Sequence, residues 1–152
     1  MNTLSFAYAT RPGEKTGTHA VKSERKYIDF VVSEQSLGTL LEIVKKDLIG
    51  AFGWSTNHAY ENQKIDEFLS LEKPELESGR TLFYVCAECG DIECGAITAE
   101  IEVKGDTVTW KNFGFENNID EPDLSAYKHI GPFQFDKIEY VELFEEIKQT
   151  VN

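Results

Sequence analysis

The sequence predicts an α+β protein with an antiparallel sheet of about five strands, an N-terminal helical segment and a C-terminal amphipathic helix packed on the sheet. Two observations carry this prediction. A period of two between Arg80 and Phe115 is typical of half-buried strands, and an apolar stripe between residues 136 and 151 has helical spacing. Strand and helix patterns do not alternate regularly, which favours α+β over a doubly wound α/β fold.

The N-terminal third predicts two strands followed by two helices. Residues 3–9 and 27–32 alternate polar and apolar side chains, as strands do. The polar segment 11–25 between them is rich in Thr, Gly and Lys, so we expect an exposed loop. Residues 57–71 are expected to form the second helix. The first helix is predicted by four apolar residues at helical spacing: Leu37, Leu40, Leu41 and Val44.

The segment from Arg80 to Phe115 is expected to be a three-stranded antiparallel meander. Its first strand is the apolar run 82–85, and its second alternates apolar and polar residues from Ile97 to Val103. A Lys-Gly-Asp turn at 104–106 leads into the third strand. The connection between the first two strands holds all three cysteines of the protein.

The chain is expected to end in an amphipathic helix. Asp136 is followed three residues later by Glu139, which is the spacing of a capping box. The inward stripe is formed by Tyr140, Phe144, Ile147 and Val151. Carboxylates are expected on the opposite, wet face, where Glu142, Glu145 and Glu146 lie.

Size and charge restrict the classes of function. With 152 residues and 41% hydrophobic residues, residues 1–152 are expected to be a single α+β domain. We find no apolar run of about 18 residues and no signal-peptide pattern, so a cytoplasmic protein is expected. The net charge of −12 opposes binding to nucleic acid or to anionic membranes and favours a basic protein as partner. The alternative is that the acidity simply keeps a small protein soluble.

The cysteines form the pattern Cys86-x2-Cys89-x4-Cys94. Three thiolates could hold zinc, structural or catalytic, if a histidine such as His58 or His129 arrived as fourth ligand. The alternatives are packed or free thiols in a tight turn, or a redox pair. The second CxxC of a zinc ribbon is missing.

No catalytic set emerges from the sequence. A Cys94–His129 pair would lack a nucleophile elbow and an oxyanion-hole signature, and no phosphate-binding glycine loop is present. The sequence therefore predicts that the protein is not an enzyme and, zinc apart, needs no cofactor.

An acidic segment flanked by aromatic residues suggests a partner-binding surface. Aromatic anchors surrounded by carboxylates suit an interface with a basic protein. The alternative is a solvated loop whose aromatic side chains point inward. The first-choice residues are Phe115, Glu116, Asp120, Glu121, Asp123 and Tyr127. The carboxylates of Glu142, Glu145 and Glu146 are the second choice.

Three stretches resemble a group of small bacterial proteins of uncharacterised function: YVCAECGDIECGAIT, VTWKNFGFENN and IGPFQFDKIEY. Members carry a C-x-x-C-G-D-x-x-C-G block and a G-P-F-x-F-D ending, and DLIGAFGW also resembles them. The resemblance implies a compact bacterial cytoplasmic protein. Its size and acidity are similar to those of immunity proteins of contact-dependent inhibition, which is an analogy and not a motif match.

The leading hypothesis is therefore an immunity or antitoxin-type protein. It would bind a basic toxin domain, with a nuclease as the expected kind, and cover its active site. The alternative, from another class, is a small zinc-binding protein that uses Cys86, Cys89 and Cys94.

Overall fold

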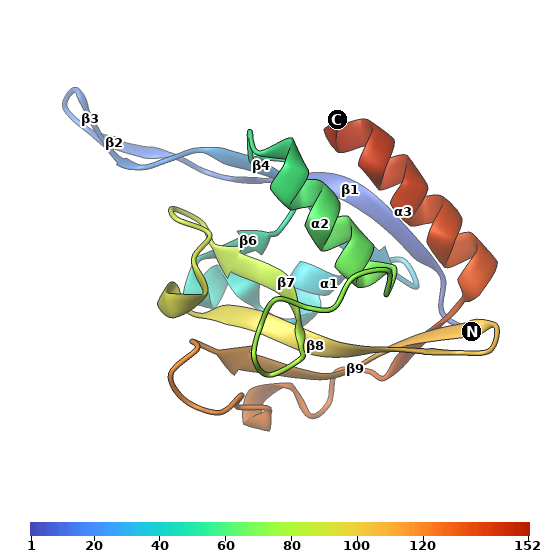
Figure 1. Cartoon of the computed structure of the whole chain (residues 1–152). Helices are drawn as coiled ribbons and strands as arrows, with labels where there is room; N and C mark the ends of the chain where they lie inside the picture. The colour runs from blue at the N-terminus through green and yellow to red at the C-terminus, as the bar shows by residue number, and fades with distance from the viewer.

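The fold is organised around a five-stranded antiparallel sheet with the order β10–β9–β8–β7–β6 (Figure 1). The computed structural model describes the backbone of residues 1–152 and every side chain except that of Ala20. The predicted meander is confirmed as β7 (Thr81–Cys86), β8 (Ala96–Lys104) and β9 (Thr107–Glu116). Short strands extend it at both edges, namely β6 (Leu48–Gly50) and β10 (Phe133–Asp136).

A second sheet is a long ribbon in which β1 (Leu4–Arg11) pairs with β4 (Arg25–Val32) along its whole length. The two-residue strand β5 (Gln35–Ser36) adds to the edge of β4. Beyond Arg11 the chain forms a hairpin arm, β2 (Glu14–Thr16) and β3 (His19–Lys22), which projects from the body of the protein (Figure 1). The expectation of a loop at residues 11–25 is therefore wrong, because an arm that is solvated on both faces shows no apolar alternation.

The first predicted helix is much shorter than expected. It forms only α1 (Leu37–Leu40), and a 3-10 turn, η1 (Ile43–Lys46), follows. Glu42 has a left-handed backbone with φ of 54°, which a continuous right-handed helix does not allow. Val44, expected to point inward, is instead 88% exposed.

The two longer helices are confirmed and lie against each other. The second predicted helix is α2 (His58–Phe68), and the last is α3 (Lys137–Val151). As the sequence predicts, the Asp136 side chain caps α3 by accepting a hydrogen bond from the backbone N–H of Glu139 at 3.1 Å. Among the described residues, no helix has both the length and the apolar character that crossing a bilayer requires.

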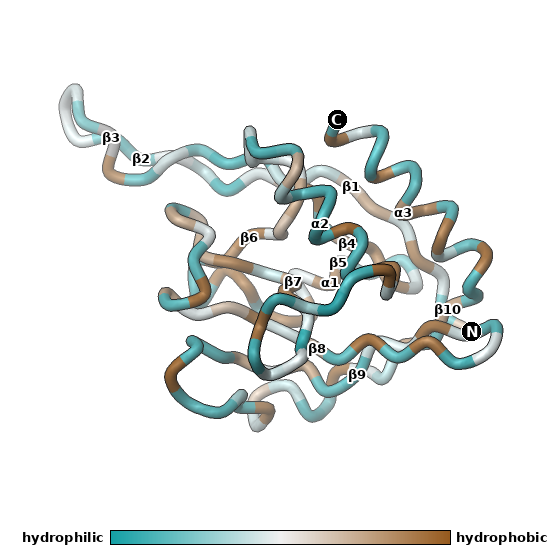
Figure 2. Tube along the Cα trace, in the orientation of Figure 1, coloured by the Kyte–Doolittle hydropathy of each residue, from teal (hydrophilic) through white to brown (hydrophobic). Residues whose placement is uncertain are grey.

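Aromatic side chains from both sheets and both longer helices form the centre of the core. Phe30 of β4 packs against Phe68 of α2, Trp110 of β9 and Phe144 of α3, with ring centroids 5.1–5.8 Å apart. Hydrophobic residues recur at intervals along α3 (Figure 2), as the predicted stripe requires. The α+β prediction is thus confirmed, and the ribbon completes the core between the helices and the sheet.

Candidate metal centre

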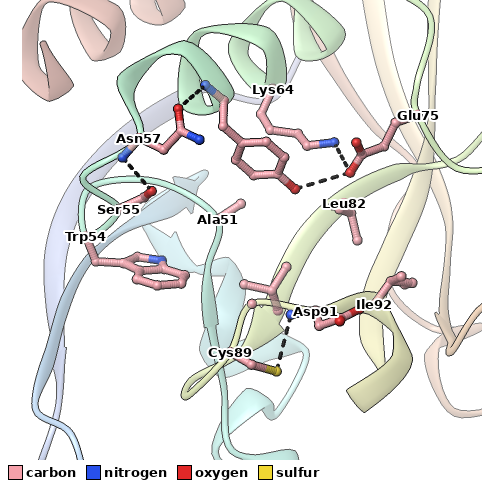
Figure 3. A pocket seen from close by; sticks show the side chains of 13 residues that line it. Ala51, Trp54, Ser55, Asn57, Lys64, Glu75, Leu82, Cys89, Asp91 and Ile92 are labelled. Atoms are coloured by element: carbon pink, nitrogen blue, oxygen red, sulfur yellow. Dashed lines mark hydrogen bonds and ion pairs between the residues drawn. The ribbon is translucent and has the colours of Figure 1, made fainter.

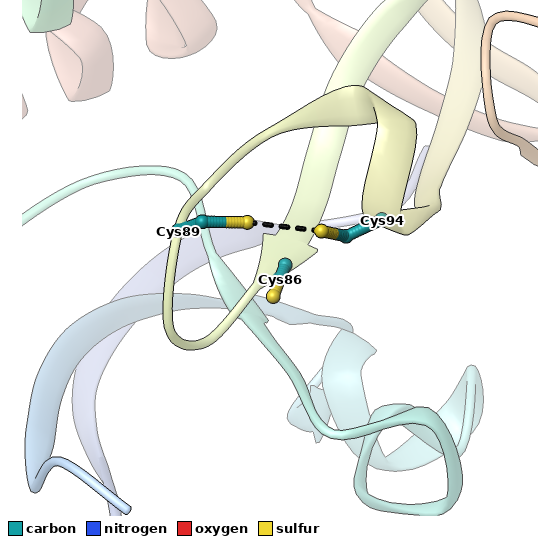
Figure 4. Close-up of side chains that lie close together, drawn as sticks. All are labelled: Cys86, Cys89 and Cys94. Atoms are coloured by element: carbon teal, nitrogen blue, oxygen red, sulfur yellow. Dashed lines mark hydrogen bonds between the residues drawn. The ribbon is translucent and has the colours of Figure 1, made fainter.

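The three cysteines meet in the connection between β7 and β8. Cys86 is the last residue of β7, Cys89 follows in a turn, and Cys94 ends the short 3-10 helix η2 (Ile92–Cys94). Their Sγ atoms all lie within 4.8 Å of one another, and those of Cys89 and Cys94 are 3.1 Å apart (Figure 4). In tetrahedral zinc sites with Zn–S bonds of about 2.3 Å, sulfur atoms are about 3.8 Å apart. Small side-chain rotations would therefore convert this cluster into three ligands of one ion.

Local backbone geometry explains why the cysteines converge. The backbone N–H of Gly90 donates to the carbonyl of Cys86 at 2.9 Å, which closes the turn. Gly90 has φ of +69°, a left-handed conformation that glycine adopts at no steric cost. The carboxylate of Asp91 then caps η2 by accepting from the N–H of Glu93 at 3.0 Å. The motif thus folds back on itself within nine residues.

Residues of the β1–β4 ribbon and of the segment before β4 hold the cysteine turn in place through hydrogen bonds. Arg11, only 8% exposed, donates two hydrogen bonds to Asp47 at 3.0 and 2.6 Å and one to Glu88 at 2.7 Å. Ser23 also donates to Glu88, through both its N–H and its hydroxyl. Arg25 donates to the carbonyl oxygens of Ala87 and Glu88. The residues between Cys86 and Cys89 are therefore fixed by groups from a distant part of the chain.

The electrostatics of this turn reflect these contacts. The hydrogen bond from Arg11, followed by those from Ser23, lowers the pKa of Glu88 to about 2. Burial opposes ionisation of Cys86, but hydrogen bonds from the backbone N–H groups of Cys89 and Glu88 and from neighbouring thiols lower its pKa overall. The hydrogen bond with Cys89, together with burial and neighbouring thiol charge, raises the pKa of Cys94 to about 12. The thiolate charge of Cys86 thus opposes ionisation of Cys94.

The cluster supports two kinds of chemistry. It offers three soft sulfur ligands, and within the described residues no fourth His, Cys, Asp or Glu donor joins the group. His58 and His129, expected as candidates for a fourth ligand, do not belong to it. Cys89 and Cys94 could also form a disulfide if their sulfur atoms approached to about 2.05 Å.

Glu116, the first carboxylate of the predicted partner surface, is buried and does not face solvent. It accepts hydrogen bonds from the hydroxyls of Thr98 at 2.6 Å and Ser78 at 3.1 Å. Its carboxylate also lies 3.6 Å from Arg80, whose side chain is 8% exposed. The expectation that Glu116 is exposed is therefore wrong, because Ser78, Arg80 and Thr98 surround its carboxylate.

The two aromatic anchors of that surface are also less exposed than expected. Tyr127 is 6% exposed and belongs to the core. Phe115 is half-buried, with its ring over Gly95 and the ammonium of Lys46 4.3 Å from the ring centroid. Gly95 has φ of +93°, and a Cβ atom there would collide with the Phe115 ring. Phe115 therefore connects the cysteine loop with the acidic loop.

Asp120, Glu121 and Asp123 are exposed, as expected, in the loop after β9. Two backbone hydrogen bonds between Phe115 and Asp123, at 2.9 and 2.8 Å, close this loop. Glu142, Glu145 and Glu146 are exposed on α3, at the opposite end of the molecule from the loop (Figure 1). The first-choice and second-choice residues therefore form two separate surfaces.

Sequence reasoning missed the residues that position the cysteine turn. Arg11 reaches Asp47 across 36 residues and Glu88 across 77. No local pattern identifies such partners; the only signal was the unusual concentration of basic residues at 11–26 in an acidic protein. No protein-family model, curated protein or solved structure matches this chain.

Proposed function

We propose that this protein binds one zinc ion through the thiolates of Cys86, Cys89 and Cys94. The observation that carries the proposal is the convergence of three Sγ atoms within 4.8 Å. A divalent cation offsets the repulsion between neighbouring thiolates. Soft sulfur ligands favour zinc over magnesium or calcium.

The arrangement favours a site with an exchangeable fourth position. Structural zinc sites usually have four protein ligands, whereas catalytic sites have three and an open position. The described residues supply three ligands, and Cys89 and Cys94 are exposed. Water or a donor from another molecule would complete the coordination, and the ion would also hold the β7–β8 connection together.

Metal content of the purified protein tests this proposal directly. We expect one zinc per chain when the protein is purified under reducing conditions without chelators, measured by inductively coupled plasma mass spectrometry. Cys86→Ser and Cys94→Ser should lose the metal, while Glu93→Ala, an exposed neighbour, should keep it. Free zinc at about 100 times Kd should stabilise the wild type by about 2.7 kcal/mol. A folded wild type that holds no zinc and is not stabilised by added zinc would contradict the proposal.

We also propose that the loop after β9 binds a basic protein, as an immunity protein binds a toxin domain. The observation that favours this function is the exposure of Ile119, 81%, beside the exposed carboxylates of Asp120 and Glu121. The Asn117 side chain accepts hydrogen bonds from the N–H groups of Ile119 and Asp120, which orders the loop. An apolar tip among carboxylates suits a cationic partner with an apolar pocket, such as a nuclease whose basic active site would be covered.

Two matched double variants test the basic partner. Purified cationic nuclease toxin domains would be titrated with the protein, and inhibition and association rate measured at low and high salt. Asp120→Asn with Glu121→Gln should slow association, whereas Glu142→Gln with Glu145→Gln, which removes the same charge from α3, should have a smaller effect. Equal effects of both double variants, or no inhibition by the wild type, would exclude the loop as the binding surface.

A further inference from the structure

A cavity of about 430 Å³ lies beside the cysteine turn, between α2, β7 and the loop after β6 (Figure 3). This volume is in the range of small-molecule sites. Leu82 and Val85 of β7 form an apolar floor together with Ile92 of η2. Trp54 and Tyr60 supply aromatic walls, so that the cavity can hold the apolar body of a ligand.

One wall of the cavity carries a carboxylate, Glu75, of which one oxygen atom is hydrogen-bonded and the other has no protein partner among the described residues. The Oε1 atom of Glu75 lies 2.6 Å from the ammonium of Lys64 and accepts a hydrogen bond from the hydroxyl of Tyr60 at 3.1 Å. Among the described residues, no hydrogen bond or ion pair involves its Oε2 atom. The side chain is 39% exposed and lines the cavity, so its carboxylate is open to a ligand.

The charge balance of the cavity favours a cation. Lys64, the ammonium in its lining, is 1% exposed and already paired with both Glu67, at 3.1 Å, and Glu75. Asp91 adds a further carboxylate to the lining, at the edge nearest Cys89 (Figure 3). The lining thus carries two carboxylates, Glu75 and Asp91, and one ammonium, which Glu67 outside the lining also neutralises. In agreement, burial first and then the charges of Glu75, Glu67 and Asp91 raise the pKa of Tyr60.

The positions of the walls suit a ligand with a charged head and an aromatic or aliphatic body. Trp54 lies across the cavity from Glu75 (Figure 3). Its ring is fixed by a hydrogen bond from Nε1 to the carbonyl of Gly50 at 2.9 Å. Arg25 contacts the same ring, 5.0 Å from its centroid, but it is outside the residues that line the cavity. An ammonium has three donors and no acceptor, which matches a carboxylate beside aromatic walls.

We propose that this cavity binds a small organic cation, with its ammonium on the free oxygen of Glu75 and its apolar body between Trp54 and the floor of Leu82, Val85 and Ile92. This site goes beyond zinc binding and beyond the basic protein partner, since neither the metal nor the loop after β9 is needed to form the Glu75 wall.

A charged probe and an uncharged probe of the same shape test the proposal. Purified protein would be titrated with 2-phenylethylamine and with 2-phenylethanol, and binding followed by calorimetry and by the fluorescence of Trp54. The other tryptophan, Trp110, is fully buried in the core and should report no change. A charge-assisted hydrogen bond to Glu75 should make the amine bind about ten- to a hundredfold more tightly than the alcohol.

Variants test whether Glu75 causes the preference for the amine over the alcohol. Glu75→Gln keeps the shape and the Oε1 acceptor but removes the charge, so the amine should lose its advantage over the alcohol. Glu77→Gln is an exposed control on the same connection and does not line the cavity. Tyr60→Leu removes an aromatic wall and should weaken both probes by a similar factor. Urea unfolding would check that each variant is folded.

Three results would overturn the proposal. The first is equal affinity of the wild type for amine and alcohol, or binding of neither. The second is full discrimination by Glu75→Gln. The third is an equal loss of discrimination in Glu75→Gln and Glu77→Gln, which would indicate a diffuse effect of net charge and not a site.

Discussion

Replacing Glu116 by alanine should destabilise the protein severely, although its position in an acidic segment suggests a harmless surface residue. The Arg80 guanidinium faces Glu116 with both side chains less than one-tenth exposed. Arg80 also donates to the hydroxyl and the carbonyl of Thr98, at 2.8 and 2.9 Å, and to the carbonyl of Asn112. Burial lowers the pKa of Arg80, an effect that the charges of Glu116 and Glu100 oppose.

The magnitude follows from leaving this guanidinium without its partner. Removal of one member of a buried ion pair costs about 3–5 kcal/mol, because the remaining charge stays desolvated. Thr98 and Ser78 would lose an acceptor in addition. Total stabilities of domains are about 5–15 kcal/mol, so Glu116→Ala should remove a large part of the free energy of unfolding.

Urea unfolding of Glu116→Ala and Glu121→Ala provides the assay. Both variants remove one carboxylate, but Glu116 is buried at the end of β9 whereas Glu121 is exposed in the loop that follows. We expect a large drop in the urea midpoint for Glu116→Ala, with little change of slope, and almost none for Glu121→Ala. Replacing Arg80 and Glu116 together by leucine should cost less than the sum of the two single changes. Equal midpoints for the two alanine variants would refute the reasoning.

Two further predictions concern the buried hydroxyl of Tyr140 and the pH dependence of stability that Glu61 causes. The Tyr140 hydroxyl accepts a hydrogen bond from the Trp110 N–H at 3.1 Å and donates one to the Phe68 carbonyl at 2.7 Å. Tyr140→Phe leaves both of these buried groups without a partner, which should lower the free energy of unfolding by about 1–3 kcal/mol for each group. Tyr8→Phe, at an exposed tyrosine, is the control in urea unfolding, and similar midpoints would contradict this prediction. Burial raises the pKa of Glu61 despite the N–H groups of Gly53 and Ser55 that lower it. Its stabilising contribution is therefore present below its unfolded pKa of about 4.3 and lost as pH rises through the folded value. The stability of the wild type relative to Glu61→Gln should therefore fall as the pH rises above about 4.3, and a constant difference would contradict this sign.

Residues that act within a short stretch of chain were predictable from the sequence. Alternation from Ile97 to Val103 identified β8, since a period of two is a property of the strand itself. Asp136 and the stripe ending at Val151 identified α3 and its cap for the same reason. The cysteine cluster also belongs to this class, because Cys86, Cys89 and Cys94 lie within nine residues and one tight turn brings them together.

Burial of polar groups could not be predicted in this way. From the sequence, Glu116 is expected on an acidic surface. In the structure it lies beside Arg80 and Ser78, and Ser78 is 38 residues away in the sequence. The left-handed conformation of Glu42, which ends α1 early, is likewise uncommon for a residue other than glycine, so its residue type does not predict it. In both cases the side-chain environment is set by packing between distant segments, which outweighs local preference.

By itself, the sequence determined the strands of the meander, the last helix and the grouping of three thiols, because each depends on contacts between near neighbours in the chain. Only the tertiary structure decided which carboxylates remain exposed, how Arg11 and Arg25 fix the cysteine turn, and where Glu75 meets Trp54 across a cavity. These features join residues tens of positions apart, so they exist only after the ribbon, the helices and the sheet have packed together.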